Sequence, residues 1–308
     1  MLYIHQAIAI SPQETSTSKL EVKEPSYEGI PKNLLRRMSK SVRMGIGASA
    51  PILRSISRPV SGIVIGTGNG GTADSYSFLQ QMKEYGEALL TPGSFAQSTS
   101  NAMASQLSMM DQNKSYNLTH VHRGLAFEMA LLDVSLLSIE DNSAFYLLAG
   151  VDELSPSNYA LDEMEGWYPP GTIAGEGAAA FLVSGQALDA MAAVRAVSTL
   201  HSSDAEVVRK ELENFLATHL PAGEEINCLI SGENGDARLS DYYKACESLM
   251  NRDTSVLHFK RLCGEYPTAS AFALWLACHQ LSGAQNYLIY NTYKGRQHSF
   301  ILLTGMSR

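Results

Sequence analysis

The sequence has few cysteines, and none of them stands in the spacing of a disulfide framework or a metal site. All four lie in the second half of the chain, without a C-x-x-C pair: Cys228, Cys246, Cys263 and Cys278. Such usage is typical of reduced thiols in a cytoplasmic protein, so we expect no bound metal and no cofactor tied to one. A long apolar run is absent, as is a charged first segment followed by an apolar core, so we expect neither a membrane span nor an exported chain.

Positive charge is also scarce. The chain has 23 Lys and Arg against 31 Asp and Glu, which gives a formal net charge of −8 at pH 7. This balance argues against a general surface for nucleic acid or anionic membranes. The exception is a basic run at residues 36–43, with Arg36, Arg37, Lys40 and Arg43, which we interpret as a solvated helix face.

The chain does have enough apolar sequence for a large core, since 45% of its residues are hydrophobic and 18% are charged. Strand-like and helix-like patterns alternate along it. Strands are predicted at residues 2–10, 60–65, 116–121, 144–149, 178–183, 193–200, 226–230, 255–259, 286–290 and 300–303. Helices are predicted at residues 33–52, 73–85, 99–109, 125–137, 205–216, 237–250 and 268–281.

The order of these elements repeats, because residues 1–186 and residues 187–308 each read βαβαβαββ. Helices between strands require parallel crossovers that cover both faces of a sheet. We therefore predict an α/β protein whose two halves stack into one compact unit and share a central helix layer. A polar stretch at residues 155–174 contains Trp167 and Tyr168, and it is read as a pocket entrance, a partner contact or, as we prefer, a packed Ω-like loop.

Residues 66–71, Gly-Thr-Gly-Asn-Gly-Gly, match the dinucleotide fingerprint G-x-G-x-x-G, with Glu84 or Glu87 as the ribose-binding acid. The motif follows the second strand of its half, and its glycines outnumber those of the fingerprint. Glu84 also lies inside a helical pattern instead of at the end of a second strand. The placement therefore argues against a bound dinucleotide.

Five segments in order resemble the β-ketoacyl-acyl-carrier-protein synthases of the thiolase superfamily. The segments are RMSK at 37–40, SGIVIGTGNGG at 61–71, STSNAMASQL at 98–107, LAGVDE at 148–153 and IAGEGA at 173–178. The resemblance extends along nearly the whole chain. It implies a thiolase-like fold, in which two such halves stack as a five-layer αβαβα sandwich.

The resemblance also identifies the position of the family's nucleophile, and here that position has none. The family's T-A-C-S/T-S-G turn places a cysteine at the start of a buried helix, where the helix dipole favours the thiolate. The matching turn is Thr-His-Val-His-Arg-Gly at 119–124, with Val121 in the cysteine's place. A valine cannot attack a thioester, and its neighbours His120 and His122 are interpreted as structural or solvent-facing.

Two family histidines, which stabilise the anion formed on decarboxylation, are replaced as well. Ser231 stands at the position of the H-G-T-S/G-T histidine. The K-x-x-x-G-H pattern keeps Lys260 and Gly264 but has Glu265 at its last position. We expect Lys260 and Glu265 to form a buried ion pair that fixes geometry. The family's glycine-rich gating loop, G-F-G-G-T/S-N, corresponds to residues 293–298, which keep Gly295 and end at His298.

The resemblance therefore implies a non-catalytic subunit of the chain-length-factor type. Such a subunit pairs with an active ketosynthase in fatty-acid, aryl-polyene or polyketide-type biosynthesis, through the strand at residues 116–121. Phe95, Met103 and Leu107 are candidates for the acyl tunnel, together with Gly295 and His298 at the gating loop, and the alternative for the methionine-rich helix is ordinary core.

Two other functions stay open. One is a divergent 3-oxoacyl synthase or acyltransferase, with Cys263 as a displaced nucleophile or, as an alternative, a small buried thiol. The other is a homodimeric protein that binds acyl carrier protein, for which the basic run would be the docking surface.

Overall fold

The structure is a computed structural model that describes residues 1–14, 16, 18–86, 90, 92–280 and 283–306. Its strands are β1 (Leu2–Ile10), β2 (Lys19–Leu20), β3 (Gly62–Gly66), β4 (Tyr116–His120), β5 (Tyr146–Asp152), β6 (Ala174–Gly175), β7 (Gly177–Ser184), β8 (Ala192–His201), β9 (Cys228–Ser231), β10 (Ser255–His258), β11 (Asn286–Tyr293) and β12 (Gln297–Gly305). Its helices are α1 (Lys32–Leu35), α2 (Lys40–Ser55), α3 (Thr72–Tyr85), α4 (Pro92–Gln97), α5 (Ala102–Asp111), α6 (Ala126–Glu140), α7 (Pro156–Met164), α8 (Ala205–His219), α9 (Ser240–Glu247), α10 (Lys260–Cys263) and α11 (Ala269–Gln280), with short 3₁₀ turns η1 (Arg123–Leu125) and η2 (Ala237–Leu239).

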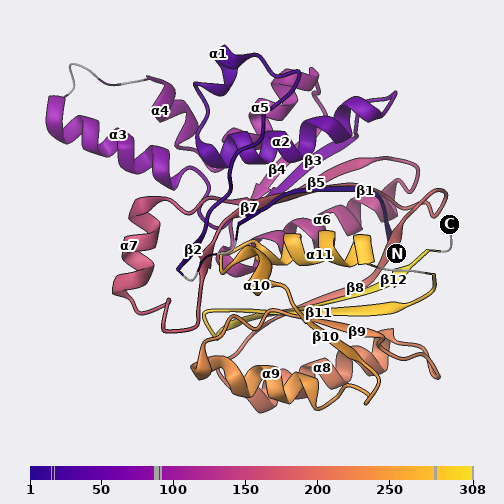
Figure 1. Ribbon diagram of the computed structural model, residues 1–308. Coiled ribbons are helices and arrows are strands. Elements are labelled where there is room, and N and C mark those ends of the chain that lie inside the picture. The colour runs from indigo at the N-terminus through magenta and orange to yellow at the C-terminus, as the bar shows by residue number, and fades with distance from the viewer. Residues whose placement is uncertain (15, 17, 87–89, 91, 281–282, 307–308) are drawn as a thin grey trace.

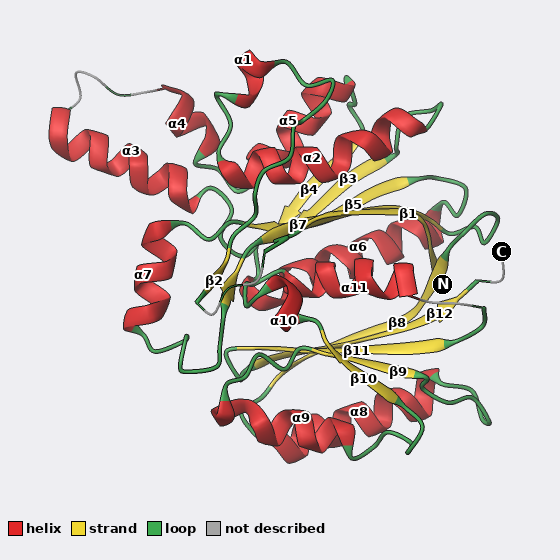
Figure 2. Ribbon diagram, viewed as in Figure 1, coloured by secondary structure: helices red, strands yellow, loops and turns green. Residues whose placement is uncertain are grey.

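Ten strands form one hydrogen-bonded sheet in the order β10-β9-β11-β12-β8-β1-β7-β5-β3-β4. β1 and β8 meet through three residue pairs, from Leu2 and Val194 to Ile4 and Ala192, and the sheet folds back on itself there. Figures 1 and 2 show the result as five layers. In order they are α2 with α5, the sheet half β1-β7-β5-β3-β4, α6 with α11, the sheet half β10-β9-β11-β12-β8, and α8 with α9. The expected αβαβα sandwich is confirmed.

The two halves have the same strand arrangement, as their element order predicted. In the first half β4, β3 and β5 run parallel, and β7 and β1 follow antiparallel. In the second half β10, β9 and β11 run parallel, and β12 and β8 follow antiparallel. We place the division between the halves at residues 186 and 187, in the segment between β7 and β8.

The central helices owe their position to their composition. The sequence of α11, ASAFALWLACHQ, carries apolar residues on every side, and nine of its twelve residues are buried. A helix that is apolar all round is typical of a helix covered on all faces. α11 contacts β1, β5 and β7 of the first half and β11 of the second, so it joins the two sheets through one core.

Close packing at the start of α6 brings the two halves together where their strands end. A Cβ on Gly66 would lie 2.6 Å from the Ala126 carbonyl oxygen, and one on Gly124 would lie 2.1 Å from the Tyr293 Cβ. Only glycine permits these approaches. The start of α6 therefore packs against both the end of β3 and the turn between β11 and β12.

Three local predictions need correction. The helix expected at residues 33–52 is two helices, α1 and α2, because the backbone is extended at Ser39, whose N–H donates to the Gln97 side chain. The stretch at residues 155–174 is not wholly an Ω-like loop, since α7 forms within it. The structure also contains α4 and α10, which the sequence patterns did not predict. Glu84 lies in α3, as its pattern indicated, and Glu87 lies outside the described residues.

Among the helices that the structure describes, none combines the length and the apolar character needed to cross a membrane.

Candidate functional site

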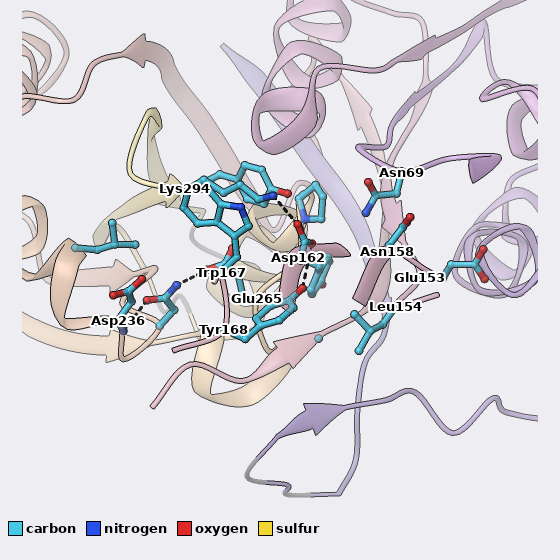
Figure 3. A pocket seen from close by; sticks show the side chains of 16 residues that line it. Asn69, Glu153, Leu154, Asn158, Asp162, Trp167, Tyr168, Asp236, Glu265 and Lys294 are labelled. Carbon is cyan, nitrogen blue, oxygen red and sulfur yellow. Dashed lines mark hydrogen bonds and ion pairs between the residues drawn. The ribbon is translucent and has the colours of Figure 1, made fainter. Parts of the chain in front are cut away.

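A narrow pocket with a cavity volume of about 20 Å³ lies at the end of the molecule where the two halves meet. Figure 3 shows its walls, which come from the glycine-rich turn, α7 and the residues after it, the loop after β9, the segment after α10 and the turn between β11 and β12. The residues that line it are Asn69, Glu153, Leu154, Asn158, Asp162, Trp167, Tyr168, Gly175, Asn234, Asp236, Leu239, Glu265, Tyr266, Pro267, Tyr293 and Lys294.

The glycine-rich turn at residues 66–71 is held by one carboxylate, Asp152 at the end of β5. Its oxygens accept hydrogen bonds from the backbone N–H groups of Gly68 at 3.0 Å and Asn69 at 2.7 Å, and from the Thr268 hydroxyl at 2.8 Å. Burial raises the pKa of Asp152 to about 6, although these hydrogen bonds act in the opposite direction. The turn thus gives its donors to a carboxylate of its own chain, where a dinucleotide phosphate would need them.

Next along the chain, the Glu153 carboxyl forms part of the pocket wall. It accepts a hydrogen bond from the Ser41 N–H at 3.1 Å. Burial raises the pKa of Glu153 to about 7, and the nearby carboxylates of Asp74 and Glu176 act in the same direction. A substantial share of Glu153 is therefore protonated near neutral pH.

Lys260 and Glu265 form the ion pair that the sequence predicted. The Lys260 Nζ lies 3.0 Å and 2.8 Å from the two carboxylate oxygens of Glu265, and it donates to the Thr292 carbonyl oxygen at 2.9 Å. The exposed fractions of the two side chains are 1% and 10%. Asn234 also donates to Glu265, at 2.7 Å, so this carboxylate is held in the pocket wall from two sides.

The turn after β4 lies beside the pocket, but its Val121 does not line the pocket. Val121 is 51% exposed. The turn is fixed by the Gln297 side chain, which accepts from the Gly124 N–H at 3.0 Å and donates to the His122 carbonyl oxygen at 3.3 Å. His120 has the structural role that we expected, since its Nε2 lies 3.0 Å from the Asp133 carboxylate.

Residues 155–172, which we call the cap, cover the pocket from the outside. The cap starts with α7, where the Ser155 hydroxyl accepts from the Asn158 N–H at 3.2 Å. Its Tyr159 and Tyr168 rings stack with centroids 5.3 Å apart, and the Lys19 ammonium lies 3.5 Å from the Tyr159 ring centroid. Trp167 and Tyr168 line the pocket, so the interpretation of this stretch as a pocket entrance is confirmed.

The remaining candidate residues lie elsewhere. Ser231 is buried at the end of β9, where its hydroxyl accepts from the Glu233 N–H at 3.3 Å. His298 is buried in the second half, with the Tyr290 hydroxyl 3.0 Å from its Nδ1 and the Ser202 carbonyl oxygen 3.0 Å from its Nε2. Burial lowers the pKa of His298 to about 4, so it is neutral at pH 7.

Gly295 occupies a tight turn between β11 and β12, with positive φ at both Lys294 and Gly295. Met103 and Leu107 are buried in the core between α5 and α2, which is the position expected of ordinary core. Phe95, in α4, is 63% exposed. Gly295, Met103, Leu107 and Phe95 do not line the pocket, whereas Lys294 does.

Cys263 is fully buried, and burial raises the pKa of its thiol well above the usual range. Its Sγ lies 3.4 Å from the Gly264 carbonyl oxygen, and it does not line the pocket. This environment favours an unreactive thiol over a thiolate nucleophile. Within the part of the chain that the structure describes, no group of three or more His, Cys, Asp or Glu side chains is arranged to hold a metal ion.

The basic run is not a uniformly solvated face. Arg36 and Arg37 are exposed, but Lys40 forms an ion pair with the buried Glu176. Arg43 pairs with Glu24, with Nη2 and Oε1 2.6 Å apart. Arg36 and Arg37 lie in the turn between α1 and α2 and not on a helix, whereas Lys40 and Arg43 lie on α2 but are paired, so the interpretation as a solvated helix face is wrong.

Comparison with known proteins places this geometry in a family. The family model described as "Beta-ketoacyl synthase, N-terminal domain" matches residues 10–229. A search of curated proteins found no match.

Solved structures show the same fold at low sequence identity. The ishigamide ketosynthase/chain length factor matches with a TM-score of 0.84 and 17% identity over 99% of both chains. A chain of AntDE:AntF, a type II PKS acyl-carrier protein in complex with its ketosynthase bound to the hexaketide, matches with a TM-score of 0.82 and 16% identity over 99% of both chains. A β-ketoacyl synthase from Burkholderia phymatum STM815 matches with a TM-score of 0.77 and 13% identity over the same shares.

Proposed function

The chain belongs to the β-ketoacyl synthase family, and from that membership we propose that it is a non-catalytic subunit of the chain-length-factor type. In this role it pairs with an active β-ketoacyl synthase in a pathway of the fatty-acid, aryl-polyene or polyketide kind. Acyl carrier protein is a further partner of the pair. The structural likeness to the ishigamide ketosynthase/chain length factor agrees with the proposal.

The lining of the pocket is the observation that carries the proposal. None of its sixteen residues is a cysteine, serine, threonine or histidine. Acyl transfer needs a nucleophile and a base within reach of it, and claisen-type condensation also needs donors for a developing negative charge. The lining contains one amine that could act as a nucleophile, that of Lys294. Its Nζ forms an ion pair with the Asp162 carboxylate, with Nζ and Oδ1 2.6 Å apart. The pocket lining therefore lacks the cysteine nucleophile and the two histidines that the family resemblance associates with this reaction.

Glu265 adds a second obstacle, because it brings a carboxylate to the pocket wall where the resemblance expects a histidine. Its charge is balanced by Lys260, so the pair as a whole offers no net positive charge to a substrate anion. Removing either partner alone would leave a buried charge without compensation. We infer that the pair serves the fold and not a reaction.

β4 is the surface through which we propose that the two subunits pair. It is the last strand of the sheet and is hydrogen-bonded to β3 on one side, so its other edge presents unpaired backbone groups. Tyr116 and Leu118 on this strand are 41% and 37% exposed. On α5, which packs against β4, Met109 is 66% exposed. An apolar edge of this kind is suited to strand addition by a partner sheet.

Size-exclusion chromatography of the chain co-expressed with a ketosynthase tests this surface. Leu118→Lys places a charge on the edge of β4 and is expected to abolish co-elution. Val256→Lys is the matched control, because Val256 is 43% exposed on β10, the edge strand at the opposite end of the sheet. Equal loss of pairing in both variants, or in neither, would reject β4 as the interface.

A further inference from the structure

The cap is fastened to the second half of the molecule by one lysine in the turn between β11 and β12. The Lys294 Nζ donates to the Asp162 carboxylate of α7 at 2.6 Å and lies 3.8 Å from the Glu165 carboxylate. It also lies 4.9 Å from the centroid of the Trp167 ring. Figure 3 shows the Lys294 side chain directed at Asp162 across the mouth of the pocket. One ammonium group therefore contacts three residues of the cap.

The backbone of the turn is shaped for this contact. Lys294 has a φ of 54°, in the left-handed region that residues other than glycine rarely adopt. Gly295 follows with a φ of 62°, and the Arg296 N–H donates to the Tyr293 carbonyl oxygen at 3.2 Å to close the turn. A strained conformation of this kind persists where the surrounding contacts determine it. Here those contacts are the pairing of β11 with β12, whose hairpin turn requires positive φ at both central residues, and the turn presents the Lys294 side chain to the cap.

A second cation, Arg238, also contacts the cap, at Gly166 and Trp167. Arg238 Nη2 donates to the Gly166 carbonyl oxygen at 2.8 Å, and the guanidinium lies 5.8 Å from the centroid of the Trp167 ring. Arg238 is itself fixed by Asp236, with Nη2 and Oδ2 2.7 Å apart. Trp167 thus lies between two cations, Lys294 and Arg238, and both contact the stretch of the cap from Asp162 to Trp167.

Lys294 and Asp162 also stand between the pocket and a groove that opens beside it. Both residues line the pocket and the groove, as do Asn69, Asn158, Pro267 and Tyr293. The two spaces are thus separated by the ion pair and its neighbours. Moving α7 away from the turn would join them and open the pocket to solutes from the groove.

We propose that Lys294 is the positioning residue that keeps the cap closed over the pocket and so controls access to it. This goes beyond the proposed function, since it concerns the single chain and does not depend on pairing with a ketosynthase. In the closed state the narrow pocket excludes solutes larger than water. Loss of the Lys294 ammonium frees α7 to swing on its attachments at Ser155 and Arg238.

The rate at which an engineered thiol reacts with the aromatic disulfide DTNB measures this access. The native cysteines give a low background, because all four are buried. Leu239→Cys places a thiol in the pocket wall at a buried position that does not line the groove, and it removes no side-chain hydrogen bond. We expect this thiol to react at least about tenfold more slowly than one at the exposed position Ser77, since reaction requires local opening.

Lys294→Met in the Leu239→Cys background is expected to raise the rate about tenfold, and Lys294→Arg, which keeps the charge, to leave it near the parent rate. Asp162→Asn removes the same contact from the cap side and is expected to act like Lys294→Met. It also keeps the test decisive if Lys294→Met does not fold. A parent thiol that reacts as fast as the one at position 77, or a folded Asp162→Asn variant with an unchanged rate, would overturn the proposal.

Discussion

Replacement of Glu265 by glutamine tests the view that the Lys260 pair stabilises the fold. The variant keeps the size of the side chain but removes the charge that balances a lysine whose exposed fraction is 1%. Lys260 would then retain the Thr292 carbonyl oxygen at 2.9 Å and the neutral amide. Breaking a buried pair in this way costs about 3–5 kcal/mol, because the remaining charge is uncompensated.

The double variant Lys260→Met/Glu265→Gln should recover most of that loss, since removing both charges also removes the cost of burying them. Urea unfolding of the four proteins gives the coupling free energy directly. Glu206→Gln is the control, because Glu206 is 69% exposed in its pair with Arg209 and such surface pairs contribute about 0–1 kcal/mol. A cost below about 1 kcal/mol for Glu265→Gln alone would refute the reasoning.

Three further outcomes follow from single groups. Burial holds the pKa of Glu153 at about 7 in the folded chain, above its ordinary value of about 4.5. Its contribution to stability is therefore present below about pH 4.5 and is lost as pH rises through 7. In Glu153→Gln the free energy of unfolding, followed through Tm, should vary less with pH, by about 3 kcal/mol over this window. Gly235→Ala should lower stability by more than about 2 kcal/mol, because its Cβ would lie 2.3 Å from the Gly171 carbonyl oxygen at a φ of 86°, whereas Gly223→Ala, with a φ of 87° and no atom within 4 Å, should cost about 1 kcal/mol in the same urea titration. Val121→Cys should remain unacylated when incubated with an acyl thioester, and a mass increase of one acyl group beyond that of Val121→Ser would contradict the view that Ser231 and Glu265, in the place of the family's histidines, also disable the site.

Much of the fold can be predicted from local sequence, because helices and strands that are buried on both faces have continuous runs of apolar residues. The run of apolar residues in α11 and the buried strand at β3 are predictable without knowledge of their partners. The repeated order of elements then fixes the stacking of the halves. Position 39 shows where this fails, since the break between α1 and α2 depends on a hydrogen bond from Ser39 to Gln97, 58 residues away.

The candidate site was predicted in part, and the difference again lies in sequence separation. Lys260 and Glu265 are five residues apart, so their pairing could be inferred from a local motif. Lys294 and Asp162 are 132 residues apart and come from opposite halves, and no local pattern connects them. The aromatic cluster at Trp167 and Tyr168 was the one available signal for a pocket wall at the cap. It did not reveal α7, whose first turn depends on Ser155 as its N-terminal cap.

The most direct measurement for the account as a whole is intact-mass analysis of acyl loading in a purified complex with the ketosynthase encoded nearest to this chain. Each protein is offered an acyl thioester alone and in the pair, and Cys263→Ala is included as a control for a displaced nucleophile. The account predicts a heterodimer in which only the ketosynthase gains the acyl mass. Acylation of this chain on its own, lost in Cys263→Ala, would contradict it and identify an enzyme with a relocated nucleophile.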